Sequence, residues 1–422
     1  MHYQQQINEK EEVQKKERAI LVGVEFSSNS YESSSDETME ELESLLKTAG
    51  GETVGRVVQK LDTPHSATFI GKGKTEELAE IVAELGADLV IFDNELSPTQ
   101  VRNLEEETKT RVIDRSQLIL DIFAMRATTR EGRLQVELAQ YKYMLPRLSF
   151  SYEALSKLGG GIGIRGPGEA KLETDRRHIS RRIQAIEREL KDVVKTRQTQ
   201  RQMRQKSAIP VIAIIGYTNA GKSTLFNRLT NETVFVEDTL FATLETTTRK
   251  TILGEEQQVL FTDTVGFIRN LSHHLVEAFK STLEEVRYSD LLLHVVDYTD
   301  ANREAQMEVA DKLLHELGAG GIPRILVWNK CDGAASGIRQ DKSCCISAKT
   351  GGNMEVLSSL IIEKLNENKR EMRVHIPYSR AALLHSIHKD GEVMEEVYEE
   401  EHIKVHLRCD AILAAKLMEF SV

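Results

Sequence analysis

The amino-acid sequence predicts an α/β protein built from several domains, and three observations carry that prediction. Short apolar runs alternate with helical stretches in two separate parts of the chain, as is typical of open α/β sheets. Between those parts, apolar residues recur at heptad-like spacing instead. One buried strand leads directly into a glycine-rich loop and a helix. With 422 residues, the chain is long enough for roughly three domains that each bury a core.

Residues 16–127 are predicted to form an N-terminal α/β domain, after a flexible charged segment at residues 1–15. Its apolar runs are AILVGVEF, TVGRVV, LVIFD and RVID, and the helical stretches between them are Met39–Thr48, Thr75–Leu85 and Ser97–Glu107. The sequence GKGKT at residues 71–75 looks like a phosphate-binding loop, but Thr68 stands where that loop requires its first glycine. A solvated basic loop is therefore the preferred interpretation.

Two apolar stripes with heptad-like spacing lie within residues 128–207. The first comprises Leu134, Leu138, Tyr141, Leu145 and Leu148, and the second comprises Ile179, Ile183, Ile186, Leu190 and Val193. A Gly/Pro segment separates them, so they predict an antiparallel helical hairpin with its tip at residues 159–169. The alternative is that both helices pack on a neighbouring domain. Pro146 should bend the first helix.

The tip sequence GGGIGIRGPGE also matches the dinucleotide-binding pattern G-x-G-x-x-G, which would suggest a dehydrogenase. That pattern requires a strand before the first glycine and a helix packed after the third. Here the helical stretch SYEALSKL precedes the glycines, and Pro167 follows Gly166 directly. The context therefore favours a flexible hairpin tip over a cofactor loop.

Charge is concentrated on the second helix of the predicted hairpin. The whole chain has a net charge of −11, which argues against a surface that binds nucleic acid throughout. Residues 171–206 nevertheless hold twelve Lys or Arg against five Asp or Glu. This concentration predicts a directed contact with a polyanion. The candidate RNA-binding residues are Arg165 in the tip and Arg176, Arg177, Arg181 and Arg182 on the helix.

A second α/β domain is predicted over residues 208–367, where the near-continuous apolar runs are typical of buried parallel strands. The run VIAIIG leads into the pattern G-x-x-x-x-G-K-S, which in this strand-loop-helix context predicts a phosphate-binding loop. Lys222 is expected to reach the β- and γ-phosphate oxygens, and the Ser223 hydroxyl to ligate Mg²⁺. The whole loop is Gly216, Tyr217, Thr218, Asn219, Ala220, Gly221, Lys222 and Ser223.

Three shorter motifs follow in an order that supports a guanine nucleotide. Asp263 is expected to hold Mg²⁺ through water, and Gly266 to bind the γ-phosphate through its N–H. A carboxylate at Asp332 can accept from guanine N1–H and the exocyclic amine, which indicates GTP rather than ATP. The Ala348 N–H can donate to guanine O6. The three motifs are Asp263, Thr264, Val265 and Gly266; Asn329, Lys330, Cys331 and Asp332; and Ser347, Ala348 and Lys349.

Together these motifs predict a P-loop GTPase domain of the Ras-like and translation-factor-like kind. It is preceded by a separate α/β domain and the helical hairpin. Residues 368–422 follow as a small α+β domain with the order strand, helix, two strands and helix, in which we identify no chemistry. The remaining Mg²⁺ ligand is expected from the segment DTLFATLETTTRK, but spacing does not choose among its threonines, and a solvated loop is the simplest interpretation for most of them.

Phe267 follows Gly266, at the position where Ras-like enzymes place a glutamine that orients the attacking water. An aromatic ring cannot hydrogen-bond that water, so we expect slow intrinsic hydrolysis and a partner that completes the site. The cysteines are Cys331, Cys344, Cys345 and Cys409, without a Cys-x-x-Cys pair, and are expected to be reduced and mostly buried. Neither a signal peptide nor a membrane span is evident, which favours a cytoplasmic protein.

Nearly the whole chain, up to about Asn366, resembles the HflX family of GTPases. The segments that carry the resemblance are ATFIGKGKTEELAE, LVIFDNELSPTQVRNLE, VIDRSQLILDIFAMRA, EGRLQVELAQ, GGGIGIRGPGEAKLETDRR, GYTNAGKSTLFN, DTVGFIRNL and NKCD. The resemblance implies a GTPase that binds the large ribosomal subunit, its rRNA and intact ribosomes. In bacteria, such proteins separate stalled ribosomes into subunits, notably under heat stress.

The resemblance also assigns residues that spacing alone leaves open. It places the switch-loop Mg²⁺ ligand at Thr243 and brings Phe241, Ala242, Leu244 and Glu245 to the nucleotide. Lys222, Thr243 and Gly266 are thereby predicted to carry catalysis. Asn219 either holds K⁺, as in some relatives, or only shapes the loop. We expect a monomer that is cytoplasmic and partly ribosome-associated. The alternatives are a GTPase that assembles the large subunit and an RNA-binding regulatory adaptor that does not depend on nucleotide.

Overall fold

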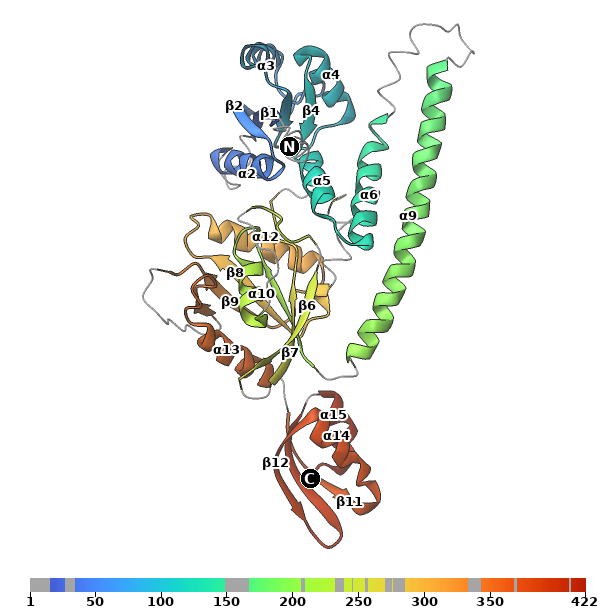
Figure 1. The fold of residues 1–422 in the computed structure, drawn as a ribbon, viewed down its shortest axis with the longest axis vertical. Helices are drawn as coiled ribbons and strands as arrows, with labels where there is room; N and C mark the ends of the chain where they lie inside the picture. The colour runs from blue at the N-terminus through green and yellow to red at the C-terminus, as the bar shows by residue number, and fades with distance from the viewer. Residues whose placement is uncertain are drawn as a thin grey trace, which may run out of the picture. The chain divides into compact units, whose positions relative to one another are not determined.

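The computed structural model forms two compact units (Figure 1). The first contains residues 1–193, 237–245 and 268–281, and the second contains residues 194–236, 246–267 and 282–422. The structure describes residues 16–26, 35–148, 167–205, 209–231, 239–244, 246–254, 257–269, 275, 285–332, 343–367, 370–409 and 411–422. The segment 1–15 and the tip residues 159–166 lie outside these ranges. Among the helices of the described ranges, none is long and apolar enough to span a membrane.

The first unit contains a four-stranded parallel sheet with the order β2-β1-β3-β4. Helices α3 and α4 pack together on one face of the sheet, and α2 packs with α5 on the other (Figure 1). This arrangement confirms the predicted α/β class. The elements are β1 (Arg18–Phe26), α2 (Ser35–Thr48), β2 (Glu52–Leu61), α3 (Lys72–Leu85), β3 (Leu89–Phe92), α4 (Pro98–Thr108), β4 (Arg111–Asp114) and α5 (Arg115–Arg126).

Buried charges tie helices α2 and α5 to this sheet. The Arg115 guanidinium, 2% exposed, lies 2.7 Å from Asp93 Oδ1 and 3.0 Å from Glu41 Oε1. Asp114 caps α5 by accepting a hydrogen bond from the Gln117 N–H at 2.9 Å. Removing one of the three charged side chains would leave an uncompensated buried charge, which is strongly destabilising. The ion pairs of Arg115 therefore hold the start of α5 in place.

Helices α6 (Arg130–Met144) and α9 (Pro167–Gln205) pack against each other through the two apolar stripes. Leu134 and Leu138 of α6 contact Ile186 of α9 in one buried cluster. The Arg182 guanidinium clamps the same pair of helices through two hydrogen bonds to the Glu137 carboxylate, 2.8 and 3.0 Å long. The predicted bend at Pro146 is wrong, because α6 ends at Met144. Proline lacks the N–H that would continue the helical hydrogen bonds, which favours a helix end over a bend.

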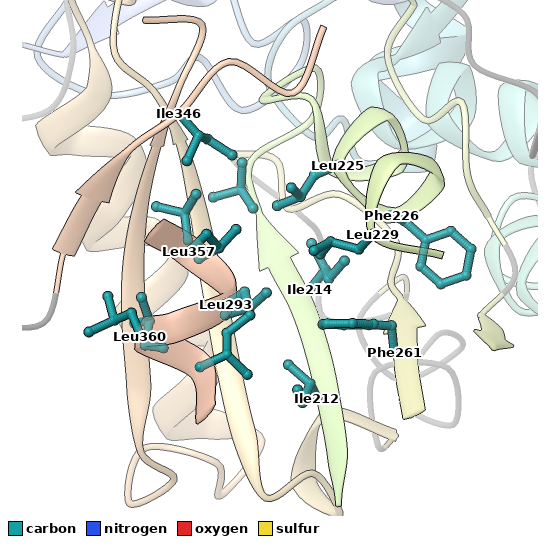
Figure 2. Close-up of a cluster of buried hydrophobic side chains, with 14 of the residues drawn as sticks. Ile212, Ile214, Leu225, Phe226, Leu229, Phe261, Leu293, Ile346, Leu357 and Leu360 are labelled. Atoms are coloured by element: carbon teal, nitrogen blue, oxygen red, sulfur yellow. The ribbon is translucent and has the colours of Figure 1, made fainter. Parts of the chain in front are cut away.

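The second unit contains a six-stranded sheet with the order β10-β9-β8-β5-β7-β6. Its core lies between β5 and the helices α10 and α13, as Figure 2 shows for Ile214, Leu225 and Leu357. The elements are β5 (Val211–Gly216), α10 (Lys222–Thr230), β6 (Thr247–Leu253), β7 (Gln257–Asp263), β8 (Leu291–Asp297), α12 (Arg303–Glu316), β9 (Arg324–Asn329), β10 (Ser343–Cys345) and α13 (Met354–Asn366).

Strand β6 was not predicted by the apolar runs. It pairs antiparallel with β7 at the edge of the sheet, and its sequence TTRKTIL is mostly half-buried or exposed. A run rich in Thr, Arg and Lys resembles a solvated loop, whereas β-branched residues on an edge strand form sheet equally well. Thr247 and Thr248, which the sequence assigned to a loop, are therefore strand residues.

The C-terminal residues form a three-stranded antiparallel sheet with the order β11-β13-β12. Alternate residues of β13, including Ile403, Val405 and Leu407, are buried beneath two helices. The observed order of strand, helix, two strands and helix agrees with the sequence. The elements are β11 (Arg370–Pro377), η1 (Tyr378–Arg380), α14 (Ala382–Asp390), β12 (Gly391–Tyr398), β13 (His402–Cys409), α15 (Ala411–Leu417) and η2 (Met418–Phe420).

Candidate functional site

The glycine-rich loop connects the end of β5 to the start of α10, and two of its glycines are sterically required. Gly216 has φ 145°, and a Cβ there would lie 2.1 Å from the Val295 carbonyl oxygen. Gly221 has φ 91°, and a Cβ there would lie 2.2 Å from Asn329 Nδ2. No other residue can adopt these conformations at such close approach. The loop therefore brings the N-terminus of α10 to the carboxyl edge of the sheet, where anions bind.

Lys222 is buried at the centre of this loop. Its ammonium donates a hydrogen bond to the Tyr217 carbonyl oxygen at 2.7 Å, which holds the side chain across the loop. Burial lowers the pKa of Lys222 to about 8, while the negative charge of Asp263 acts in the opposite direction. A phosphate placed beside this amine would favour its charged form.

Ser223 and Asp263 supply two oxygen groups beside the loop. The Ser223 hydroxyl donates a hydrogen bond to Asp263 Oδ2 at 2.8 Å, and both residues are buried. Thr264 fixes the end of β7 by donating to the Ile214 carbonyl oxygen at 2.7 Å. A hydroxyl and a carboxylate are ligands that Mg²⁺ prefers, and Mg²⁺ is the ion that GTPase domains use with their nucleotide. The residues at this position therefore fit Mg²⁺.

Gly266 and Phe267 lie directly against the glycine-rich loop. The Phe267 N–H donates to the Gly216 carbonyl oxygen at 3.0 Å, and the Phe267 carbonyl oxygen accepts from the Thr218 N–H at 2.8 Å. The ring of Phe267 is 1% exposed. A Cβ at Gly266 would lie 2.9 Å from Lys222 Nζ, so only glycine fits there without displacing the lysine. The apolar ring packs in the interior and offers no hydrogen bond to a substrate.

Two segments are predicted to bind the base, residues 329–332 and residues 347–349. Asn329, in the first of these base-binding segments, joins the phosphate loop to the second. Its Nδ2 donates to the Ala220 carbonyl oxygen at 2.9 Å, and its Oδ1 accepts from the Ala348 N–H at 2.9 Å. The Ala348 N–H that the sequence assigned to guanine O6 thus has an internal partner in this structure. The Ser347 hydroxyl donates to the Asp332 carboxylate, which brings the two base-binding segments together.

Two residues that sequence reasoning missed support these segments. The Arg228 guanidinium on α10 donates to the Ala348 carbonyl oxygen at 3.3 Å and to the Lys349 carbonyl oxygen at 2.7 Å. Asp297, at the end of β8, pairs with Lys330 Nζ at 2.7 Å, and hydrogen bonds from Lys330 and Thr299 lower its pKa although burial opposes them. An acidic residue closing an apolar strand was the only sequence signal for Asp297, and Arg228 had none.

The segment with the predicted switch-loop ligand belongs to the first unit. Phe241 is 2% exposed and packs edge-on against Phe123 of α5, with ring centroids 4.7 Å apart. Arg126, also on α5, donates to the Thr239 hydroxyl at 3.3 Å. Glu245 lies outside the described residues. The roles of Phe241, Ala242, Thr243, Leu244 and Glu245 toward nucleotide and Mg²⁺ stay predictions.

The candidate RNA-binding arginines differ in their surroundings. Arg165 lies outside the described residues. Arg176 and Arg181 are exposed on α9, and Arg177 is exposed but pairs with Glu173 at 2.8 Å. Arg182, in contrast, is engaged by Glu137 within the hairpin, which raises the pKa of its guanidinium.

The four cysteines are free, and Cys331, Cys344 and Cys345 lie in or next to the base-binding segments, whereas Cys409 lies on β13. Cys344 and Cys409 are buried, whereas Cys331 and Cys345 are half-buried. Burial and the neighbouring Cys345 raise the pKa of the Cys331 thiol to about 12, and the same two causes raise that of Cys344 to about 12. Both groups are therefore thiols at neutral pH rather than reactive thiolates.

Known proteins match the chain along most of its length. Residues 36–124 match the family described as GTP-binding GTPase N-terminal, residues 126–204 the GTP-binding GTPase middle region, and residues 211–330 the 50S ribosome-binding GTPase family. The GTPase HflX of Caldanaerobacter subterraneus is 48% identical over 410 residues, which cover 96% of this chain and 94% of the relative. The GTPase HflX of Escherichia coli is 42% identical over 393 residues, 91% of each chain.

A solved structure with similarity to this chain is a GTP-binding protein from the archaeon Sulfolobus solfataricus in complex with GDP. It is 24% identical, with a TM-score of 0.43, over 83% of this chain and 99% of the other.

Proposed function

The chain belongs to the HflX family of GTPases and hydrolyses GTP, and from this premise we propose that it is a ribosome-binding factor. Its GTP-bound form associates with the large ribosomal subunit and with intact ribosomes in the cytoplasm. GTP orders the loops around the γ-phosphate, the ordered state binds the ribosome, and hydrolysis permits release. The outcome of this cycle is the separation of stalled ribosomes into subunits, for example under heat stress.

The observation that carries the proposal is a basic stripe on α9, formed by Arg177, Arg181, Arg188, Lys191 and Lys195. All five side chains are exposed. Ile186 marks the side of α9 that is buried against α6. Arg177 and Lys195 each lie nine residues from Ile186, and nine steps of roughly 100° bring a residue to the opposite side of the helix. The stripe therefore faces away from α6.

Such a stripe suits the phosphate backbone of rRNA. Its first and last residues are 18 positions apart, which is roughly 27 Å of helix. A row of cations of that length can neutralise several successive phosphates, which supplies affinity that falls with salt concentration. The name of the family that residues 211–330 match, 50S ribosome-binding GTPase, supports the large subunit as the partner.

The buried ring of Phe267 supports stimulation by the ribosome. Since this residue cannot orient the attacking water, turnover in the isolated protein should be slow. We expect ribosomal subunits to raise the rate of GTP hydrolysis strongly, and equal rates with and without subunits would contradict this part of the proposal.

A sucrose-gradient profile tests the proposal directly. Intact ribosomes are incubated with the protein and GTP, GDP or a non-hydrolysable GTP analogue. With the analogue, we expect material to shift from intact ribosomes to free subunits, with the protein on the large subunit. A GTPase that assembles the large subunit is the second candidate, supported by the same family name, and it would leave intact ribosomes unshifted while it binds immature particles.

Variants of the basic stripe test the RNA contact. The triple change Arg181→Gln, Arg188→Gln and Lys191→Gln should weaken binding to large subunits and reduce its salt dependence. Arg182→Gln is the matched control, because it replaces an arginine of the same helix that does not belong to the stripe. It breaks the pair with Glu137, so it should destabilise the packing of α6 on α9. The salt dependence of binding to large subunits should stay as in wild type. If both variants bind with wild-type salt dependence, α9 does not contact RNA.

A nucleotide-independent RNA-binding adaptor would behave differently again. Lys222→Ala removes the buried ammonium of the phosphate loop and should abolish subunit separation by a GTP-driven factor. An adaptor would keep its function in this variant.

Asn219 supports a separate proposal for K⁺. The residue has φ 60°, a conformation that asparagine adopts more readily than most residues, and this also suits a purely structural role. If its side chain holds K⁺ beside the phosphates, turnover should be faster in K⁺ than in Na⁺ at equal ionic strength. Equal turnover in the two salts would leave Asn219 with the structural role.

A further inference from the structure

Thr218 carries a buried hydroxyl for which the site described above provides no use. The residue is 6% exposed, and its N–H is already committed to the Phe267 carbonyl oxygen. Among the described residues, its Oγ1 has no hydrogen-bond partner. A buried hydroxyl without a partner costs roughly 1–3 kcal/mol, so such a group is expected to have a functional reason.

The position of Thr218 indicates which part of the nucleotide it meets. A Cβ built at Gly266 would lie 2.8 Å from Thr218 Cγ2 and 2.9 Å from Lys222 Nζ. The methyl group of Thr218 and the lysine ammonium therefore both lie beside Gly266, and the Thr218 hydroxyl is carried on the same Cβ as that methyl group. In GTPases, the lysine at the position of Lys222 and the glycine at the position of Gly266 contact the γ-phosphate. Thr218 thus lies at the γ-phosphate end of the loop.

The attacking water must also be held at this place. The residue after Gly266 does not supply a group that holds it. Phe267 is buried and offers no hydrogen bond. A threonine hydroxyl is both a donor and an acceptor, so it can accept from a water and donate to a phosphate oxygen at the same time.

We propose that the Thr218 hydroxyl is a further catalytic group, which orients the attacking water by accepting a hydrogen bond from it while donating to a γ-phosphate oxygen. The water oxygen then bonds to the γ-phosphorus as the bond from that phosphorus to the β–γ bridging oxygen breaks. The electron pair of the broken bond stays with GDP, and both water protons end on the released phosphate. The hydroxyl keeps its own proton throughout. This inference rests on GTP hydrolysis alone and is independent of ribosome binding.

Single-turnover GTP hydrolysis by the full chain without ribosomes tests the proposal. Thr218→Val keeps the shape of the side chain but removes the hydroxyl, and it should lower the rate roughly tenfold or more. Thr218→Ser keeps the hydroxyl and should hydrolyse GTP within about threefold of the wild-type rate. The affinity of both variants for GDP should stay within about twofold of wild type, and the affinity of Thr218→Val for a non-hydrolysable GTP analogue should fall by much less than its rate.

Two further measurements separate catalysis from a structural role. Thr218→Val removes an unpaired buried hydroxyl, so the melting temperature of the nucleotide-free protein should stay the same or rise. Thr262→Val is the matched control, because Thr262 is 2% exposed on β7 and its hydroxyl bonds to Thr248 at 3.0 Å. The control should keep the wild-type rate.

A wild-type rate in Thr218→Val would overturn the proposal. So would a loss of nucleotide affinity as large as the loss in rate, because the hydroxyl would then act in binding. Ribosome-gradient results bear only on the function proposed above, so the two proposals can fail separately.

Discussion

His294 makes the stability of the second unit depend on pH. It lies within β8, is 2% exposed, and in the part of the chain that the structure describes its Nδ1 has no hydrogen-bond partner. Its pKa is lowered from 6.5 to about 4, and burial is the largest cause. The positive charges of Arg324 and Lys222 add to that shift, and Asp311 opposes it. The native state therefore holds a neutral imidazole.

The magnitude follows from the two pKa values. Above pH 6.5 His294 is neutral in both states, so its contribution to stability is fully present. As the pH falls from 6.5 toward 4, the unfolded chain binds a proton that the folded chain does not, and stability is lost. A gap of about 2.5 pH units at about 1.4 kcal/mol per unit gives a total of about 3 kcal/mol, of which about 2 kcal/mol is lost by pH 5.

Thermal unfolding of the full chain at pH 7.5 and pH 5.0 measures this loss. GDP identifies the relevant transition, because a ligand raises the melting temperature of the domain that binds it. For His294→Leu, we expect the drop in that melting temperature between the two pH values to be smaller than in wild type by about 4–8 °C. His315, an exposed histidine on α12, provides the control His315→Gln, which should respond to pH as wild type does. A drop of wild-type size in His294→Leu would refute the reasoning.

Three further predictions concern the nucleotide site and the segment held by the first unit. Gly221→Ala places a methyl group 2.2 Å from Asn329 Nδ2 at φ 91°, so the affinity for GDP and GTP in a fluorescent-nucleotide titration should fall at least about tenfold. Lys222 has a pKa of about 8, and phosphates keep it charged when bound. Affinity should therefore fall as the pH rises from 8 to 9.5, and calorimetry in two buffers should detect proton uptake on binding. Phe241→Ala removes the ring contact with Phe123 and should cost the first unit roughly 3 kcal/mol of stability. Hydrogen exchange at residues 239–244 should then accelerate, with little further effect of Phe123→Ala in the double variant.

The parts of this protein that sequence predicted are those whose cause is local. The phosphate loop is contiguous, and the steric need for glycine at Gly216 and Gly221 follows from the pattern itself. The strands β5 and β8 are apolar along their whole length because both faces are covered, so hydropathy alone identified them. The α/β class followed from these elements.

The parts that sequence missed depend on neighbours from distant segments. Strand β6 is an edge strand whose pairing with β7 is not encoded by its own polarity. Arg228 looks like any helical arginine until the turn after Ala348 folds against it, over a separation of 120 residues. The contact of Phe241 with Phe123 likewise joins two segments that lie far apart in the sequence. No local pattern contains such contacts.

The arginines of α9 show why counting charges is not enough to assign their roles. Arg181 and Arg182 are adjacent and chemically identical, but successive residues on a helix point roughly 100° apart. That rotation carries Arg182 to the edge of the apolar seam, where Glu137 meets it, and leaves Arg181 in the exposed stripe. An arginine in a bidentate pair must break two hydrogen bonds before it can bind a phosphate, whereas an exposed one loses only solvent. The same local charge density therefore divides into residues that hold the hairpin together and residues available to a polyanion, and the phase of the helix relative to its seam decides which is which.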